Sequence, residues 1–169
     1  MSDPKPLSRR TLLVGTTAAV AGLVLPAMAT QTSKPKDKPP ALSADLVKDF
    51  VIAGHRDLDK VKEMLGNERS LLNASWDWGG GDFEMAIGGA GHMGRPDIAR
   101  YIIGEGGRMD IFVATMLGEM DMVKATITKF PNLLQSHGPH GIPLLAHAKA
   151  GGDEAAHVLE YLEKLMKDA

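Results

Sequence analysis

Residues that could bind a metal or stack on a ligand gather in two glycine-containing stretches of this chain. The first stretch, residues 73–82, holds both tryptophans, and the second, residues 136–141, holds two of the six histidines. Imidazole and carboxylate groups are ligands of divalent metals, and an exposed indole can stack on a sugar or a peptide side chain. The candidate ligand- or partner-binding residues in and between these stretches are Trp76, Asp77, Trp78, Asp82, Glu84, His92, His137 and His140.

The tryptophan stretch has two interpretations. Trp76 and Trp78 flank Asp77, so both indoles face the same side if the segment is extended. Exposed indoles would form a stacking platform for a sugar or a peptide side chain, whereas buried indoles would fasten the loop to the next structural repeat. The sequence leaves both interpretations open.

The histidines supply enough donors for Zn²⁺ or another divalent ion, but their spacing does not identify a metal site. The chain has no His-Glu-x-x-His motif, so metal binding is left open. His92, which follows a glycine-rich segment, and His140, in a Gly-Pro-His-Gly loop, are the preferred functional candidates. We expect a structural role for His147, inside an apolar helix, and solvation or helix capping for His55 and His157.

The sequence contains no assembled catalytic constellation. The glycine runs at residues 79–81 and 88–91 are not followed by Lys-Ser or Lys-Thr, so neither is a phosphate-binding loop. Ser136 merely adjoins His137, and no nucleophile is paired with a recognisable base. We therefore predict no catalytic residues, no enzymatic activity and no cofactor, with a hydrolytic enzyme as the weaker alternative.

Charge and cysteine content narrow the classes of partner. The formal charge of the chain is −2, but residues 41–169 contain 13 Lys or Arg and 19 Asp or Glu, a net charge of −6. Nucleic-acid binding depends on clustered basic residues, so we predict no nucleic-acid partner. The chain has no cysteine and hence no disulfide, and packing alone must stabilise it.

The N-terminal residues indicate export. Arg9 and Arg10 precede an apolar run, and Ala27-Met28-Ala29 ends it with a small-x-small cleavage pattern. We predict a signal peptide of the twin-arginine type over residues 1–29, a Lys/Pro-rich disordered linker over residues 30–42, and a periplasmic or secreted domain without a stable membrane span. The alternative is an uncleaved membrane anchor over residues 12–29.

Apolar periodicity from residue 43 onward predicts helices in consecutive pairs. Ser43 is placed to cap the first helix, and Pro96 occupies a first-turn position that proline tolerates. The expected helices span residues 44–54, 57–65, 83–93, 96–103, two within 111–130, 142–148 and 153–167. Three glycines within residues 83–93 each cost about 0.5–1 kcal/mol relative to alanine, so we expect a close approach there, by a neighbouring helix or by a bound molecule.

The phrase at residues 114–127, an apolar helix followed by a glycine turn and a second helix with an acidic start, resembles the ankyrin repeat, as does the Ile-Pro-Leu-Leu-Ala-His-Ala sequence at 142–148. The resemblance implies an all-α helical-repeat solenoid of about four repeats over residues 43–168. Gly118 and Gly151 lie 33 residues apart, as in the family, but Gly94 and Gly118 lie only 24 apart, which shortens the loop at residues 106–110. Residues 76–79 and 138–141 resemble a bacterial exported subgroup of ankyrin-repeat proteins.

The resemblance also implies a binding face, because hairpin loops and inner helices line the concave surface of ankyrin proteins. Two long loops on either side of a shortened one would leave a notch between them. The predicted function is a non-catalytic periplasmic scaffold whose concave face binds another protein. The alternative is a small-molecule or divalent-metal binder at the notch lined by tryptophan and histidine.

Overall fold

The structure is a computed structural model that describes residues 38–168. The predicted signal peptide, residues 1–29, and residues 30–37 of the predicted linker lie outside the described residues. Residues 38–42 of that linker adopt no helix or strand and are largely exposed. Residues 39–168 form one compact unit. The folded domain therefore begins close to the predicted boundary at residue 43.

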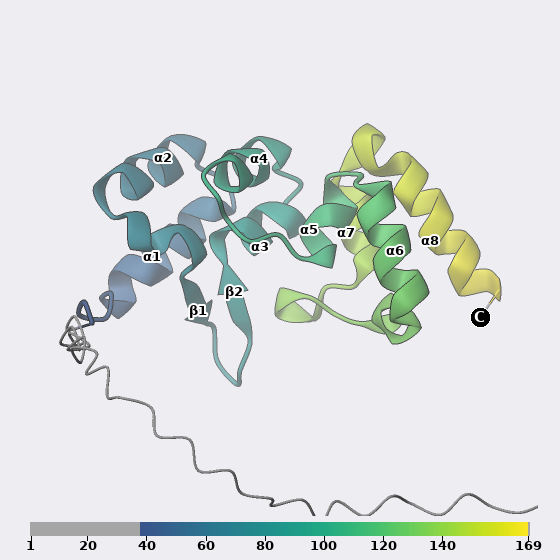
Figure 1. The fold of residues 1–169 in the computed structure, drawn as a ribbon, viewed down its shortest axis with the longest axis horizontal. Coiled ribbons are helices and arrows are strands. Elements are labelled where there is room, and N and C mark those ends of the chain that lie inside the picture. The colour runs from purple at the N-terminus through teal and green to yellow at the C-terminus, as the bar shows by residue number, and fades with distance from the viewer. Residues whose placement is uncertain (1–37, 169) are drawn as a thin grey trace, which may run out of the picture. The chain divides into compact units, whose positions relative to one another are not determined.

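The described residues are mostly helical, as predicted. The α-helices are α1 (Ala44–Gly54), α2 (Leu58–Asn67), α3 (Ala86–His92), α4 (Pro96–Gly104), α5 (Ile111–Met116), α6 (Met120–Lys129), α7 (Leu144–Ala150) and α8 (Ala156–Asp168). Short 3₁₀ helices are η1 (Arg69–Asn73), η2 (Pro131–Gln135), η3 (Pro139–Gly141) and η4 (Gly152–Ala155). Helices α1, α3, α5 and α7 pack in succession, and each is paired with the helix that follows it in the chain (Figure 1).

Side-chain caps and glycine turns define the helix pairs. Ser43, Asp57 and Asp110 each accept a hydrogen bond from a backbone N–H in the first turn of the helix that follows. Gly94 and Gly118, in the turns after α3 and α5, have φ of 63° and 74°, which glycine adopts without steric cost. Their backbones also lie so close to carbonyl groups of later segments that a Cβ would clash. The turns therefore form part of the packing between successive pairs.

The core consists of two apolar clusters. The first is built around the fully buried residues Phe50, Leu71, Ile98 and Ile102, from α1 to α4. The second is built around Val123, Leu144, Val158 and Leu162, from α6 to α8. Residues of α5 contribute to both clusters. Each helix pair thus buries its apolar face against the neighbouring pairs.

A β-hairpin corrects the prediction of helix from residue 83. Strand β1 (Ser75–Asp77) pairs antiparallel with β2 (Phe83–Met85), and α3 begins only at Ala86. The intervening Gly79, Gly80 and Gly81 all have positive φ, which permits the tight connection. In β2, Phe83 is exposed and Glu84 is buried, as expected where successive side chains of a strand point to opposite faces. The predicted helix over residues 83–93 was therefore wrong for residues 83–85, which form β2.

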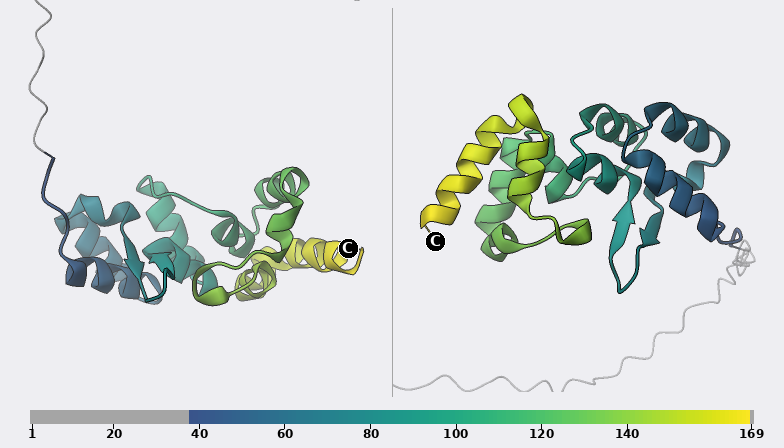
Figure 2. Two further views of the ribbon diagram at one scale, coloured as in Figure 1. Left: turned by 90° about the horizontal axis from the view of Figure 1, so that it is seen from below. Right: turned by 180° about the vertical axis from the view of Figure 1, so that it is seen from behind.

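The hairpin and the η3 segment project from the helices on the same side (Figures 1 and 2). Both strands of the hairpin contact α1, and β2 also contacts α3. The backbone N–H of His140, in η3, donates a hydrogen bond to Asp82, in the loop that joins the two strands. The two loops that the sequence analysis singled out thus meet beside α1 and α3. Within the described residues, no helix is sufficiently long and apolar to cross a membrane.

Candidate metal centre

Glu84 is the centre of the candidate site. It is the middle residue of β2, and the strand turns its side chain inward, where the carboxylate is completely buried. Trp78 Nε1 donates a 2.7 Å hydrogen bond to Glu84 Oε2. Burial alone would raise the pKa of Glu84, but hydrogen bonds from His92 and Trp78, and the charge of His55 when protonated, outweigh burial and lower it. The carboxylate therefore stays ionised at neutral pH.

Three histidines from three separate segments surround this carboxylate. His55 follows the last residue of α1, His92 is the last residue of α3, and His140 lies in η3. Their Nε2 atoms lie 3.4, 2.9 and 3.3 Å, respectively, from the nearest Glu84 oxygen. One ligand atom from each of the four residues lies within 4.8 Å of every other. Two ligands of a tetrahedral zinc ion with bonds of 2.0–2.1 Å are about 3.3 Å apart, so the spacing suits a shared ion.

Hydrogen bonds to the other ring nitrogen orient two of these imidazoles. His55 Nδ1 lies 2.9 Å from the carbonyl oxygen of Val51, and His140 Nδ1 lies 2.8 Å from Asp82 Oδ2. Since a carbonyl and an ionised carboxylate only accept hydrogen bonds, both Nδ1 atoms carry the proton. In its neutral form, each of these rings would present an Nε2 lone pair to the centre, which is the arrangement of metal-binding histidines with an oriented outer nitrogen.

Without an ion, this arrangement has an electrostatic conflict. Neutral His55 and His140 would direct lone pairs at the Glu84 carboxylate, and two lone pairs at 3.3–3.4 Å from an anionic oxygen repel it. Protonating one ring would turn its contact with Glu84 into an ion pair but leave the other lone pair facing the carboxylate, and protonating two or three rings would bring like charges together beside one buried negative charge. A divalent cation between the four groups removes both conflicts, because each lone pair and the carboxylate then face a positive charge.

The backbone at His140 adopts a strained conformation that hydrogen bonds to Asp82 hold in place. His140 has a φ of 59°, and among the described residues it is the only one other than glycine with a positive φ. A non-glycine residue in this region costs on the order of 1–3 kcal/mol and persists only where its surroundings impose it. Asp82 imposes it by accepting hydrogen bonds from both the backbone N–H and Nδ1 of His140. The backbone hydrogen bond, with smaller contributions from the ring, lowers the pKa of Asp82.

The glycines of α3 make room for the site. A Cβ on Gly89 would lie 2.6 Å from His55 Nδ1, so alanine there would displace the imidazole. A Cβ on Gly91 would lie 3.2 Å from a methyl group of Val113, in α5. Of the two explanations offered by the sequence, close packing of neighbouring elements accounts for both positions. At Gly89 the neighbour is itself a candidate ligand.

The structure brings together five of the eight residues predicted from sequence. Glu84, His92 and His140 are candidate ligands, and Trp78 and Asp82 orient them. The other three lie outside this group. Trp76 is half-buried against the first core cluster with Lys48 over its ring, Asp77 accepts a hydrogen bond from Gly79 N–H, and His137 is an exposed residue that lines a neighbouring cavity.

Trp76 therefore fits the interpretation of an indole that fastens its loop to the core, whereas Trp78 donates a hydrogen bond to Glu84, a role that neither interpretation included.

His55 is the functional candidate that sequence reasoning missed. The expectation of capping is correct, because His55 is the C-cap of α1 and its Nδ1 lies 2.9 Å from the Val51 carbonyl oxygen. The expectation of solvation is wrong, because the side chain is only 18% exposed and lies against Glu84 and His92. The glycine at position 89 was the available signal, since a glycine in an inner helix leaves space for a side chain of the neighbouring helix. The other two histidines behave as expected. His147 is buried with Nδ1 at 3.0 Å from the Pro143 carbonyl oxygen, and His157 is exposed and bonds the Gly118 carbonyl.

Comparisons with protein-family models, with curated proteins and with solved structures gave no significant match.

Proposed function

We propose that this protein binds a Zn²⁺ ion, or a chemically similar divalent transition metal, through the Nε2 atoms of His55, His92 and His140 and the carboxylate of Glu84. The observation that carries the proposal is the convergence of these four ligand atoms within 4.8 Å of one another. The ligands come from α1, β2, α3 and η3, so their convergence is a property of the fold rather than of one local sequence.

The donor set favours zinc over the common alkaline-earth ions. Ca²⁺ and Mg²⁺ are bound almost entirely by oxygen atoms, whereas three imidazoles and one carboxylate suit Zn²⁺, Ni²⁺ or Cu²⁺. Four protein ligands fill a tetrahedral zinc site and leave no position for a substrate, as in structural rather than catalytic zinc sites. The geometry therefore supports a non-catalytic metal-binding domain, in which the ion holds the hairpin and the η3 segment against α1 and α3.

The remaining sequence-based hypotheses are compatible with this proposal. Four successive helix pairs, three of which have a glycine in the turn between their helices, support an ankyrin-type solenoid as the finer description of the fold. A protein-binding concave face and a periplasmic or secreted location stay predictions. In such a scaffold, the metal centre would stabilise the loops from which the binding face is built, because binding an ion only in the folded state stabilises that state.

The test is a competition between the purified protein and a chromophoric zinc chelator, with a matched pair of variants from one loop. His140→Ala removes a ligand, and His137→Ala removes an exposed imidazole three residues earlier that is not part of the four-residue cluster. We expect the first change to weaken zinc binding by about 100-fold or more and the second to leave it unchanged. Equal affinities of both variants and the unmodified protein would contradict the proposal.

A further inference from the structure

We propose that a cavity next to the metal centre binds an arginine side chain of a protein partner. The cavity has a volume of about 460 Å³ and is lined by all three loops that the sequence analysis associated with a notch. Its walls include Phe83, Met85, Phe112 and Pro139, and its polar groups include Asp82 and Asp110. This site is distinct from the four metal ligands, none of which lines it.

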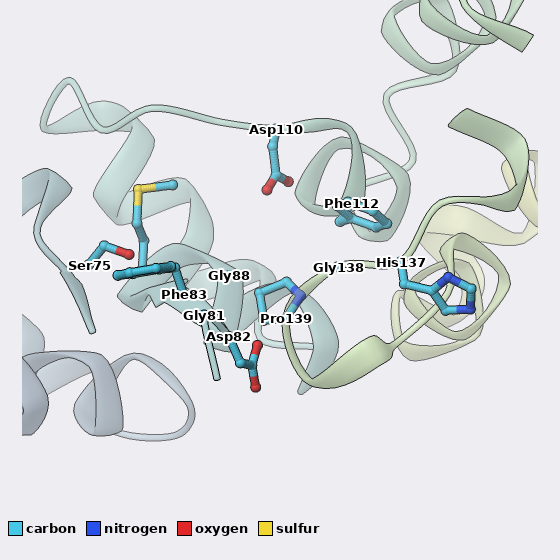
Figure 3. Close-up of a pocket in the computed structure, with 11 residues that line it drawn as sticks. Ser75, Gly81, Asp82, Phe83, Gly88, Asp110, Phe112, His137, Gly138 and Pro139 are labelled. Carbon is cyan, nitrogen blue, oxygen red and sulfur yellow. The ribbon is translucent and has the colours of Figure 1, made fainter. Parts of the chain in front are cut away.

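Two aromatic rings form opposite sides of the cavity. Phe83 lies on the hairpin side and Phe112 on the α5 side, with Pro139 between them (Figure 3). Phe83 is 61% exposed, although large apolar side chains are normally buried. An exposed phenyl ring at the rim of a cavity is suited to stack on a planar group, and phenyl rings attract cations that lie over their faces. Guanidinium is both planar and cationic.

Asp110 supplies the negative charge for this cation. Its carboxylate extends toward the cavity between the two rings (Figure 3), and one oxygen caps α5 by accepting a hydrogen bond from Val113 N–H. Among the described residues, no Lys, Arg or His nitrogen lies within 4.0 Å of this carboxylate. Asp82 differs, because both of its oxygens accept hydrogen bonds from His140. The second oxygen of Asp110 is therefore the acceptor that this cavity offers to a cation.

The charge of the domain favours a basic partner over an acidic one. Residues 41–169 carry a net formal charge of −6, which attracts basic surfaces. His137, the remaining ionisable group in the lining, is exposed, and its ring points away from the centre of the cavity in Figure 3. An arginine side chain would place its aliphatic stem against Phe83 and Pro139 and its guanidinium beside Asp110.

A peptide titration monitored by NMR of the ¹⁵N-labelled full chain tests this inference. The probe is a capped Gly-Ser-Gly-Arg-Gly-Ser-Gly peptide, and its control is the same peptide with citrulline, which keeps the shape of arginine and removes the charge. On the protein, Asp110→Asn removes the charge while retaining a good helix cap, and Asp49→Asn removes an equal charge from an exposed site on α1.

We expect saturable shifts of the Phe83 and Phe112 amides with the arginine peptide. Citrulline and Asp110→Asn should each weaken binding by about tenfold, as for loss of one charge-assisted hydrogen bond, whereas Asp49→Asn should not. Equal binding of both peptides, equal effects of the two Asp variants, or no saturable shift at about 10 mM peptide would overturn the inference. The zinc competition is a separate measurement, so either proposal can fail while the other stands.

Discussion

The two halves of the domain differ in the polar partners that surround their buried polar side chains. Among the described residues, the buried polar or charged side chains are Glu84 in the first half and Thr115 and His147 in the second. Glu84 is surrounded by three imidazoles and an indole N–H. His147 makes one hydrogen bond to a backbone carbonyl, and the Thr115 hydroxyl has no hydrogen-bond partner.

The comparison between His55 and His147 shows what distinguishes a site from a structural histidine. Each ring places Nδ1 next to the carbonyl oxygen four residues earlier, at 2.9 and 3.0 Å. The local hydrogen bond is therefore the same, and it orients both rings. Only His55 then faces a carboxylate, because the hairpin inserts Glu84 beside it. A metal centre thus requires the hairpin as well as the histidines.

The largest expected effect is that of removing the central charge. Glu84→Gln keeps an acceptor for Trp78 but weakens the metal ligand, so zinc should no longer stabilise the fold. At a zinc concentration 100 times its dissociation constant, the unmodified protein should gain about 2.7 kcal/mol in unfolding free energy. Thermal or chemical denaturation with and without zinc measures this gain. Glu63→Gln, at an exposed position on α2, should retain the full gain, and a full gain in Glu84→Gln would show that Glu84 is not a ligand.

A smaller effect is expected from crowding His55. Gly89→Ala would place a Cβ 2.6 Å from the His55 ring, and we expect zinc affinity to fall by about tenfold because the ring must move off its hydrogen bond. Gly88→Ala is the matched control. Its Cβ would lie 3.5 Å from Glu84 Cγ, an ordinary contact, so zinc affinity should not change. Isothermal titration of both variants gives the comparison, and equal affinities would mean that the position of His55 is unimportant for binding.

The next effect is the dependence of stability on pH through the buried histidine His147. Burial lowers the pKa of His147, although the hydrogen bond to Pro143 opposes the shift. The unfolded chain therefore takes up this proton more readily than the folded one. Its contribution to stability is complete above the ordinary histidine pKa of about 6.5 and is lost as the pH falls toward the lowered folded pKa.

His147→Gln should accordingly show a flatter decline of unfolding free energy below pH 6.5 than the unmodified protein, by at most about 1.4 kcal/mol per pH unit, the slope for one proton. The exposed His157→Gln should follow the unmodified protein. Urea denaturation of the three proteins in parallel between pH 5 and 8, a range that brackets the ordinary histidine pKa, measures the difference in slope. Identical slopes for His147→Gln and the unmodified protein would contradict the assignment of His147.

The smallest effect is expected at the unpaired hydroxyl of the second half. Thr115→Val replaces a buried donor that lacks a partner with a methyl group of similar size, so the unfolding free energy should rise by up to about 1 kcal/mol. Thr128→Val, on the exposed side of α6, should give no comparable gain. Zinc affinity should be unchanged in both. A clear loss of stability in Thr115→Val would indicate that the hydroxyl has a partner in solution.

The helix pairs could be predicted because their signals are local. Ser43, Asp57 and Pro96 lie at helix starts, and apolar spacing near 3.6 residues marks the buried faces. The hairpin could not be predicted in the same way. Each strand has only three residues, too few for alternation to stand out from the helical pattern that follows at Ala86.

The site was predictable in part, again because only local signals can be read from the sequence. Glu84, His92 and His140 were predicted as site residues from their residue types and their glycine-rich surroundings. His55 did not, because it comes from α1 and reaches Glu84 only through packing against Gly89. A cavity lined by residues of the two long loops and by Asp110 of the shortened one lies where loop length predicted a notch, but neither tryptophan lines it.

The most direct test of the metal centre is anomalous X-ray diffraction from crystals of the zinc-loaded protein, with data collected on both sides of the zinc absorption edge. We predict one strong anomalous peak per chain, within bonding distance of Glu84 and of the Nε2 atoms of His55, His92 and His140. A peak elsewhere on the chain, or no peak from a protein saturated with zinc in solution, would contradict the account.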